Sequence, residues 1–178
     1  FVALPVAGSD RADYLVRNGY SEPGRLSVKG GSYGGYMTLA AITEYPKVFS
    51  AAVDEVGIAN FVTFLERTAE YRRAMREAEY GPLTDRPFLE SISPLHKAGL
   101  IETPLLVVHG ENDPRVPVSE ARQIVEAIRA RGGEVDTLIF PDEGHGVAKR
   151  ANALVAYRRL VEFLDRHLKG PAGPAGLD

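Results

Sequence analysis

Short apolar runs alternate with helical patterns over most of the chain. Each run is rich in β-branched and other apolar residues over about five or six positions, a length typical of strands. The predicted strands are Leu26–Gly30, Phe49–Val53, Pro104–His109 and Val135–Phe140. Helical patterns separate and follow these runs, at residues 10–17, 33–45, 119–131 and 157–168. This order predicts an α/β fold in which a parallel sheet carries helices on both faces.

Signals at the ends of the helical patterns set the expected boundaries. Asp10 is a candidate N-cap of the first helix, and Ser119 is the expected N-cap of the third. A mixed stretch between Gly57 and Thr103 is expected to be an insertion of helix and loop. In the last helix, the helical spacing of apolar residues predicts a stripe that faces the core. The members of this stripe are Tyr157, Leu160, Val161, Leu164 and Leu168.

Composition narrows the range of partners. The 178 residues are 44% hydrophobic and 25% charged, so we expect one domain over residues 1–169 and a disordered tail over residues 170–178. A net charge of −3, with mixed signs along the chain, argues against nucleic acid or a membrane surface as a partner. The absence of cysteine excludes disulfides, thiolate metal sites and a cysteine nucleophile. No apolar run approaches the roughly 18 to 20 residues of a membrane helix, and we expect a cytoplasmic location.

A serine lies at the predicted junction between the first strand and the second helix. The residues around it, Gly30-Gly31-Ser32-Tyr33-Gly34-Gly35, contain the pattern G-x-S-x-G. Such a nucleophile elbow lifts the hydroxyl out of the sheet, and glycines two residues before and after the serine allow strand and helix to cross closely. Ser32 is therefore the predicted nucleophile. The backbone N–H of Tyr33, at the start of the helix, is the predicted oxyanion donor.

A serine nucleophile needs a base, and proteins with this elbow present serine, acid and histidine in that order along the chain. Of the four histidines, only His145 lies in a loop just after the fourth predicted strand, and it has a glycine on each side. That position suits a base that reaches over the edge of the sheet. His109 is the alternative, but it ends the third strand and precedes the acid candidate.

Asp113 is the predicted acid because it follows the most apolar strand directly, at the carboxyl end of the sheet. A buried carboxylate in that position can accept a hydrogen bond from the imidazole and hold its tautomer. Glu111 in the same loop, and Asp54 or Glu55 after the second strand, are the alternatives.

Together these motifs resemble the prolyl oligopeptidase family of serine peptidases over most of the chain. The most specific pieces are Gly30-Gly31-Ser32-Tyr33-Gly34-Gly35-Tyr36-Met37, Asp113-Pro114-Arg115-Val116-Pro117 and Glu143-Gly144-His145-Gly146. The resemblance implies that residues 1–169 form the C-terminal part of an α/β-hydrolase catalytic domain. It also implies that Arg115 binds a substrate backbone carbonyl. Phe61 and Phe64 become candidates for the pocket of the residue before the scissile bond, although core packing explains them equally well.

The chain departs from the family's pattern at its N-terminal side. Only 31 residues precede Ser32, whereas the fold normally places several strands before the elbow. We therefore expect the N-terminal strands to be missing, together with the loop that carries a second oxyanion donor and the β-propeller of the relatives. The missing part of the domain and the propeller are then expected partners. An open sheet edge would also allow pairing with another copy as a homo-oligomer.

The predicted function is a serine peptidase that hydrolyses short peptides through an acyl-enzyme, with Ser32, Asp113 and His145 as the triad and no cofactor or metal. A carboxylesterase of the same fold is the close alternative. A segment without activity of its own, which serves in folding or assembly, is the alternative from a different class.

Overall fold

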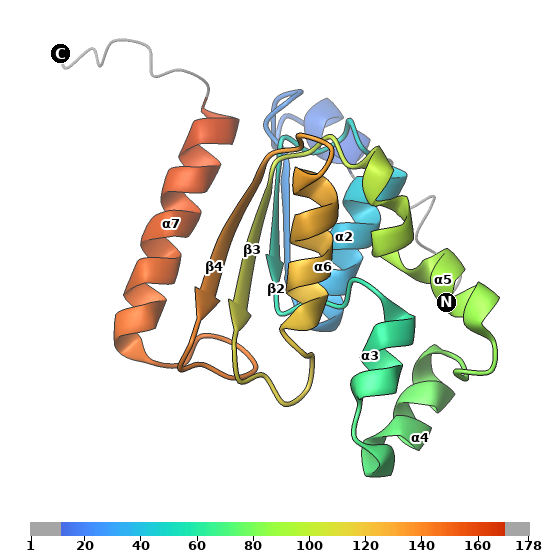
Figure 1. The fold of residues 1–178 in the computed structure, drawn as a ribbon. Helices are drawn as coiled ribbons and strands as arrows, with labels where there is room; N and C mark the ends of the chain where they lie inside the picture. The colour runs from blue at the N-terminus through green and yellow to red at the C-terminus, as the bar shows by residue number, and fades with distance from the viewer. Residues whose placement is uncertain (1–11, 170–178) are drawn as a thin grey trace, which may run out of the picture.

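A four-stranded parallel sheet forms the centre of the molecule (Figure 1). In this computed structural model, which describes residues 12–169, the strands lie side by side in chain order. They are β1 (Ser27–Gly31), β2 (Ala51–Glu55), β3 (Leu105–Gly110) and β4 (Val135–Phe140). The predicted parallel α/β arrangement is confirmed. Because all four strands run the same way, their carboxyl ends and the loops that follow them meet at one edge of the sheet.

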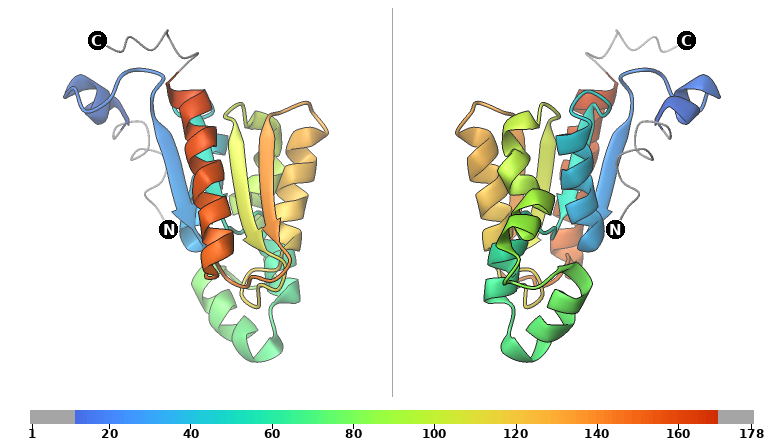
Figure 2. Two further views of the ribbon diagram at one scale, coloured as in Figure 1. Left: turned by 90° about the vertical axis from the view of Figure 1, so that its left-hand side faces the viewer. Right: turned by 90° about the vertical axis from the view of Figure 1, so that its right-hand side faces the viewer.

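Helices cover both faces of the sheet, as predicted (Figures 1 and 2). Helices α2 (Tyr33–Glu44) and α6 (Ser119–Arg129) lie on one face, and α7 (Arg150–Leu168) lies on the other. A further helical segment spans residues 12–17. The N-cap expected at Asp10 and the tail expected at residues 170–178 lie outside the described residues.

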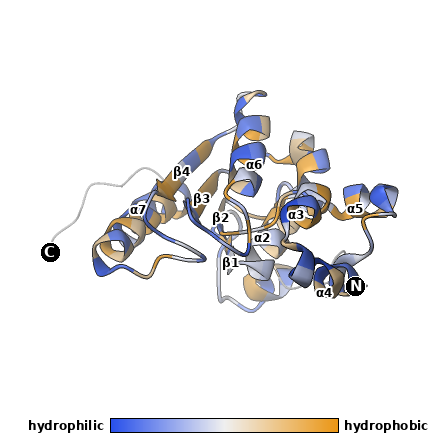
Figure 3. Ribbon diagram, turned by 60° about the horizontal axis from the view of Figure 1, so that its bottom comes forward, coloured by the Kyte–Doolittle hydropathy of each residue, from blue (hydrophilic) through white to orange (hydrophobic). Residues whose placement is uncertain are grey.

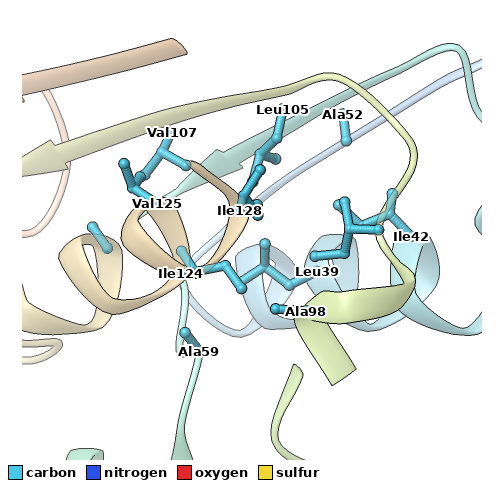
Figure 4. Packing of buried hydrophobic residues seen from close by; sticks show 12 residues of the cluster. Leu39, Ile42, Ala52, Ala59, Ala98, Leu105, Val107, Ile124, Val125 and Ile128 are labelled. Atoms are coloured by element: carbon cyan, nitrogen blue, oxygen red, sulfur yellow. The ribbon is translucent and has the colours of Figure 1, made fainter. Parts of the chain in front are cut away.

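The larger part of the core lies between the sheet and helices α2 and α6 (Figure 4). Its buried members include Leu39, Ile42, Leu105, Val107, Ile124 and Ile128. Strand β3 is buried along its whole length, because its alternate side chains contact the helices on opposite faces. Hydrophobic residues accordingly concentrate in β3 (Figure 3). This two-sided burial explains why the sequence there is a continuous apolar run.

The predicted stripe of α7 is partly wrong. Tyr157 and Val161 are 68% and 56% exposed, whereas Phe163, which the stripe omitted, is fully buried. Phe163 packs against the sheet with flanking residues at helical spacing, namely Ala156, Leu160, Leu164 and Leu168. The apolar residues of this helix extend over more than one face, so their spacing alone does not identify the face that meets the sheet.

Other boundaries also differ from the prediction, and the largest difference is that α7 begins at Arg150 rather than near Tyr157. Strand β2 begins at Ala51 rather than Phe49, because the parallel register pairs Ala51 with Ser27 while Phe49 packs against the core beside the sheet. Ser119 is the first residue of α6 rather than its N-cap, a position held by Val118, and the Ser119 side chain makes no capping hydrogen bond.

The stretch between β2 and β3 is helical, as expected for the insertion. It contains α3 (Phe61–Arg67), α4 (Glu70–Tyr80), α5 (Arg86–Ile92) and a 3-10 helix, η1 (Pro94–Leu100). Helix α3 is attached to α6 through the buried Glu120, whose carboxylate accepts hydrogen bonds from the Asn60 N–H at 2.8 Å and the Thr63 hydroxyl at 2.6 Å. Among residues 12–169, no helix combines the length and the apolar character needed to cross a membrane.

Candidate active site

Ser32 occupies a strained turn between β1 and α2. Its φ of 58° and ψ of −117° lie in a region that residues with a Cβ rarely adopt. The Ser32 N–H donates to the Glu55 carbonyl at 2.8 Å, which ties the turn to β2, and the Ser32 carbonyl accepts from the Tyr36 N–H at 3.1 Å. These backbone contacts hold the turn while leaving the hydroxyl available for chemistry.

Of Gly30 and Gly34, which lie two residues before and after the serine, only Gly30 occupies a position where a side chain would collide. A Cβ on Gly30 would lie 2.1 Å from the Gly34 carbonyl oxygen, whereas a Cβ on Gly34 would meet nothing within 4 Å. The expectation that both glycines avoid a collision is therefore corrected. Strand and helix cross so closely that the Gly34 backbone fills the place of a Gly30 side chain.

The three predicted triad residues meet at the carboxyl ends of their strands. Ser32 follows β1, Asp113 follows β3, and His145 follows β4. The Ser32 Oγ lies 2.9 Å from His145 Nε2, and His145 Nδ1 lies 2.7 Å from Asp113 Oδ2. The Asp113 side chain is fully buried and that of His145 is 15% exposed. The parallel sheet thus brings together three residues from distant parts of the chain.

The hydrogen bonds of Asp113 determine the tautomer of His145. Asp113 Oδ1 accepts from the backbone N–H groups of Arg115 and Val116, at 2.8 and 2.9 Å. Because an ionised carboxylate only accepts, His145 Nδ1 carries the hydrogen that is shared with Oδ2. His145 Nε2 is then free to accept a proton from the Ser32 hydroxyl, as a general base must.

Glu143 shapes the loop that carries His145, a role that sequence reasoning missed. Its carboxylate accepts hydrogen bonds from the backbone of Lys149 at 2.9 Å and of Ala148 at 3.2 Å, and from the Asn152 amide at 2.9 Å. These bonds, above all the one from Asn152, lower the pKa of Glu143. The ionised side chain therefore connects the histidine loop to the start of α7.

The sequence matches a known protein family. The profile of the prolyl oligopeptidase family matches residues 9–171, nearly the whole chain. The chain belongs to this family. Its α/β-hydrolase fold is shared with solved acylaminoacyl peptidases.

Several known peptidases are similar to this chain. Dipeptidyl aminopeptidase BIII from Pseudoxanthomonas mexicana is 38% identical over 176 residues, which cover 95% of this chain and 25% of that protein. The structure of a puromycin-hydrolyzing peptidase from Mycobacterium tuberculosis superposes with a TM-score of 0.86 at 31% identity, over 96% of this chain and 27% of that one. An acylaminoacyl peptidase from Pyrococcus horikoshii superposes with a TM-score of 0.80 at 27% identity, over 93% and 27%. The chain therefore spans about a quarter of the length of these relatives.

The other residues predicted to bind substrate occupy different environments. Arg115 is exposed and lies in the same loop as Asp113. The Tyr33 ring stacks on Tyr80, with ring centroids 6.3 Å apart. Phe61 and Phe64 are 0% and 2% exposed and pack in a core cluster with Leu65 and Leu89. Their burial favours core packing, the alternative left open by the sequence, over a place in the pocket, because a side chain enclosed by the core cannot contact substrate directly.

The alternative acids have other partners. Glu111 pairs with Arg122 at 2.7 Å, and Glu55 pairs with Lys29 at 2.8 Å. Asp54 points between two glycines: a Cβ on Gly35 would lie 2.3 Å from Asp54 Oδ1, and one on Gly57 would lie 2.1 Å from it. Only Asp113, of these four carboxylates, hydrogen-bonds to His145 among the described residues. Within residues 12–169, no three His, Cys, Asp or Glu side chains converge as metal ligands.

The buried carboxyl group of Asp54 is expected to make the free energy of unfolding depend on pH. Its side chain is completely buried, and this burial raises its pKa to about 7. In the unfolded chain the carboxyl ionises near its ordinary pKa of about 4, so the folded state holds an extra proton between these values. The free energy of unfolding should therefore fall as pH rises from about 4 to about 7, by at most about 1.4 kcal/mol per pH unit through this group.

Chemical denaturation over this pH range measures the effect. The Asp54→Asn variant should lack this component of the pH dependence, so its free energy of unfolding relative to that of wild type should rise between about pH 4 and pH 7. Glu90→Gln is the matched control, because Glu90 is exposed on α5 and is not among the groups that act on Asp54, so this change should leave the slope unchanged. A difference between Asp54→Asn and wild type that stays constant with pH would contradict burial of a protonated Asp54.

Proposed function

We propose that this chain carries the catalytic centre of a serine peptidase that hydrolyses short peptides. The observation that carries the proposal is the continuous set of hydrogen bonds from Ser32 Oγ through His145 to Asp113, at 2.9 and 2.7 Å. Membership of the prolyl oligopeptidase family supports the same reaction class. The chain's relatives include proteins named as dipeptidyl and acylaminoacyl peptidases.

The proposed reaction proceeds through an acyl-enzyme. Ser32 Oγ attacks the scissile carbonyl carbon while His145 Nε2 takes the hydroxyl proton. The carbonyl oxygen becomes an oxyanion, for which the Tyr33 backbone N–H at the start of α2 is the proposed donor. Breakdown of this intermediate breaks the C–N bond, and the imidazolium gives its proton to the leaving amine. Water activated by His145 then hydrolyses the ester, and Asp113 stabilises the imidazolium in both steps.

Other parts of the full-length protein complete the proposed site. A second oxyanion donor and a β-propeller are both expected from the family resemblance. This chain spans about a quarter of the length of its relatives, so there is room for both in a protein of similar size. Activity is therefore to be measured on the full-length protein.

Peptide anilides and short acyl esters distinguish the peptidase from a carboxylesterase. The Ser-His-Asp arrangement can cleave both bonds, but an amide needs protonation of its leaving group by the histidine. We expect the full-length protein to cleave dipeptidyl or acylaminoacyl anilides, with kcat/KM for these substrates at least comparable to that for acetyl esters. Cleavage of esters alone would contradict the peptidase assignment.

Arg115 is the proposed contact to the substrate backbone. Its backbone is fixed by the bond from its N–H to Asp113 Oδ1 at 2.8 Å, and its exposed guanidinium can donate to a carbonyl that a peptide has and an acetyl ester lacks. Arg115→Ala should lower kcat/KM for peptides by about ten- to a hundredfold, equal to about 1.4 to 2.7 kcal/mol, and change ester hydrolysis much less.

Steady-state kinetics on both substrates test the role of Arg115. Arg122→Ala is the matched control, because Arg122 is an exposed arginine that pairs with Glu111. Equal losses on peptide and ester would mean that Arg115 supports the acid loop instead. Unchanged peptide cleavage would remove Arg115 from the substrate site.

A further inference from the structure

His109 lies at the end of β3, directly next to the loop of the triad acid. Its side chain is completely buried. His109 Nε2 lies 2.9 Å from the Val116 carbonyl oxygen and 3.5 Å from Asp113 Oδ2. The same Oδ2 lies 2.7 Å from His145 Nδ1. One carboxylate oxygen of Asp113 therefore lies near two imidazoles, those of His109 and His145.

The surroundings of His109 specify its tautomer and charge. The Val116 carbonyl can only accept a hydrogen bond, so Nε2 must carry the hydrogen. Nδ1 is buried without a hydrogen-bond partner among the described residues, so protonation there would leave a second N–H unsatisfied. Burial also lowers the pKa of His109. The ring is therefore neutral, and its Nε2–H points toward the acid loop.

Val116 is held from both sides by this arrangement. Its carbonyl accepts from His109, and its N–H donates to Asp113 Oδ1 at 2.9 Å. A change at His109 would thus act on the acid in two ways. It would loosen the Val116 backbone, whose N–H holds Oδ1. It would also remove the partial positive charge of the His109 Nε2–H group near Oδ2.

We propose that His109 is a positioning residue for Asp113, which orients the acid and moderates its negative charge through the Nε2–H group. This inference rests on the proposed serine peptidase mechanism. The charged or titratable groups that face His109 are Asp113 and Glu111 from the loop after β3 and His145 from the loop after β4. Because Asp113 stabilises the imidazolium form of His145, a donor beside Asp113 weakens that stabilisation.

Two substitutions separate this role from simple packing. His109→Leu fills a similar volume without a donor, whereas His109→Gln can place an amide N–H near the position of Nε2. In the full-length protein, we expect His109→Leu to lower kcat/KM for a peptide anilide by about tenfold or more, mainly through kcat. The pKa of the acidic limb of the kcat/KM profile should rise, because Asp113 loses its neutralising donor. His109→Gln should restore most of the rate and return that pKa toward the wild-type value.

The outcomes distinguish this inference from the proposed function. If wild type does not cleave peptides, the proposed function fails. If wild type is active and His109→Leu retains full activity, or loses activity with an unmoved acidic limb, His109 serves only packing and the inference is wrong.

A measurement on the unaltered protein keeps the inference testable even if His109→Leu does not fold. NMR of protein labelled with ¹⁵N-histidine should show His109 in the neutral Nε2–H tautomer, still neutral at the pH of about 6.5 at which an ordinary histidine is half protonated. Detection of the Nδ1–H tautomer, or titration of His109 near neutral pH, would overturn the inference.

Discussion

Replacing Ser32 with alanine in the full-length protein is expected to lower kcat for peptide anilides by about a millionfold, because no other group takes the place of the attacking oxygen. The fold should persist, since the structural contacts of Ser32 are made by its backbone. Its N–H bonds to the Glu55 carbonyl and its carbonyl bonds to the Tyr36 N–H, and alanine retains both. The free energy of unfolding should change by less than about 1 kcal/mol.

Steady-state kinetics and denaturant unfolding of the same preparation test this expectation. Ser91→Ala is the matched control, because Ser91 is an exposed serine of α5 whose hydroxyl donates to the Phe88 carbonyl of its own helix. Retention of more than a trace of peptide cleavage in Ser32→Ala would remove Ser32 from the nucleophile's role. Loss of activity accompanied by unfolding would point to strain in the turn rather than to chemistry.

Asp113→Asn should be the next most damaging change, with a loss of about ten-thousandfold in kcat. The asparagine oxygen is expected to take the place of Oδ1, where it can accept from the N–H groups of Arg115 and Val116. The amide NH₂ would then face His145 Nδ1 and donate to it. That contact forces the hydrogen onto Nε2, which can no longer accept the proton of Ser32.

Two other carboxylates serve as comparisons for Asp113→Asn. Glu111→Gln removes a charge from the same loop and breaks the surface pair with Arg122, but it leaves the hydrogen bonds of Asp113 in place, so the rate should remain near the wild-type value. Asp54→Asn tests the position after β2. If Asp54→Asn abolished catalysis and Asp113→Asn did not, the acid would be assigned to the wrong loop.

The sequence allowed prediction of those parts of the molecule that depend on local pattern. The apolar run of β3 predicts a strand buried on both faces, and G-x-S-x-G at a strand-to-helix junction predicts the turn at Ser32. In a parallel sheet, strand ends meet at one edge, which is why Asp113 and His145 could be expected near the serine. The hydrogen bonds between them agree with that expectation.

Contacts between distant segments could not be predicted in the same way. Asn60 and Glu120 are 60 positions apart, and only the packing of α3 on α6 joins them. Gly35 reads as part of the serine motif, but the side chain it makes room for belongs to Asp54 on β2. His109 is a candidate base by residue type, but its proposed role depends on the hydrogen bond between its Nε2 and the Val116 carbonyl, seven residues along the chain. In each case, the deciding partner is absent from the local sequence.

Labelling the full-length protein with a fluorophosphonate, followed by peptide mapping, tests the central proposal most directly. The probe forms a stable bond only with a serine whose hydroxyl is activated by a base, so it reports on the Ser32–His145–Asp113 arrangement without assuming a substrate. We predict a single modified residue, Ser32, and loss of labelling in both Ser32→Ala and His145→Ala. Labelling at another residue, or no labelling of the folded wild-type protein, would contradict the proposal that Ser32 is an activated nucleophile.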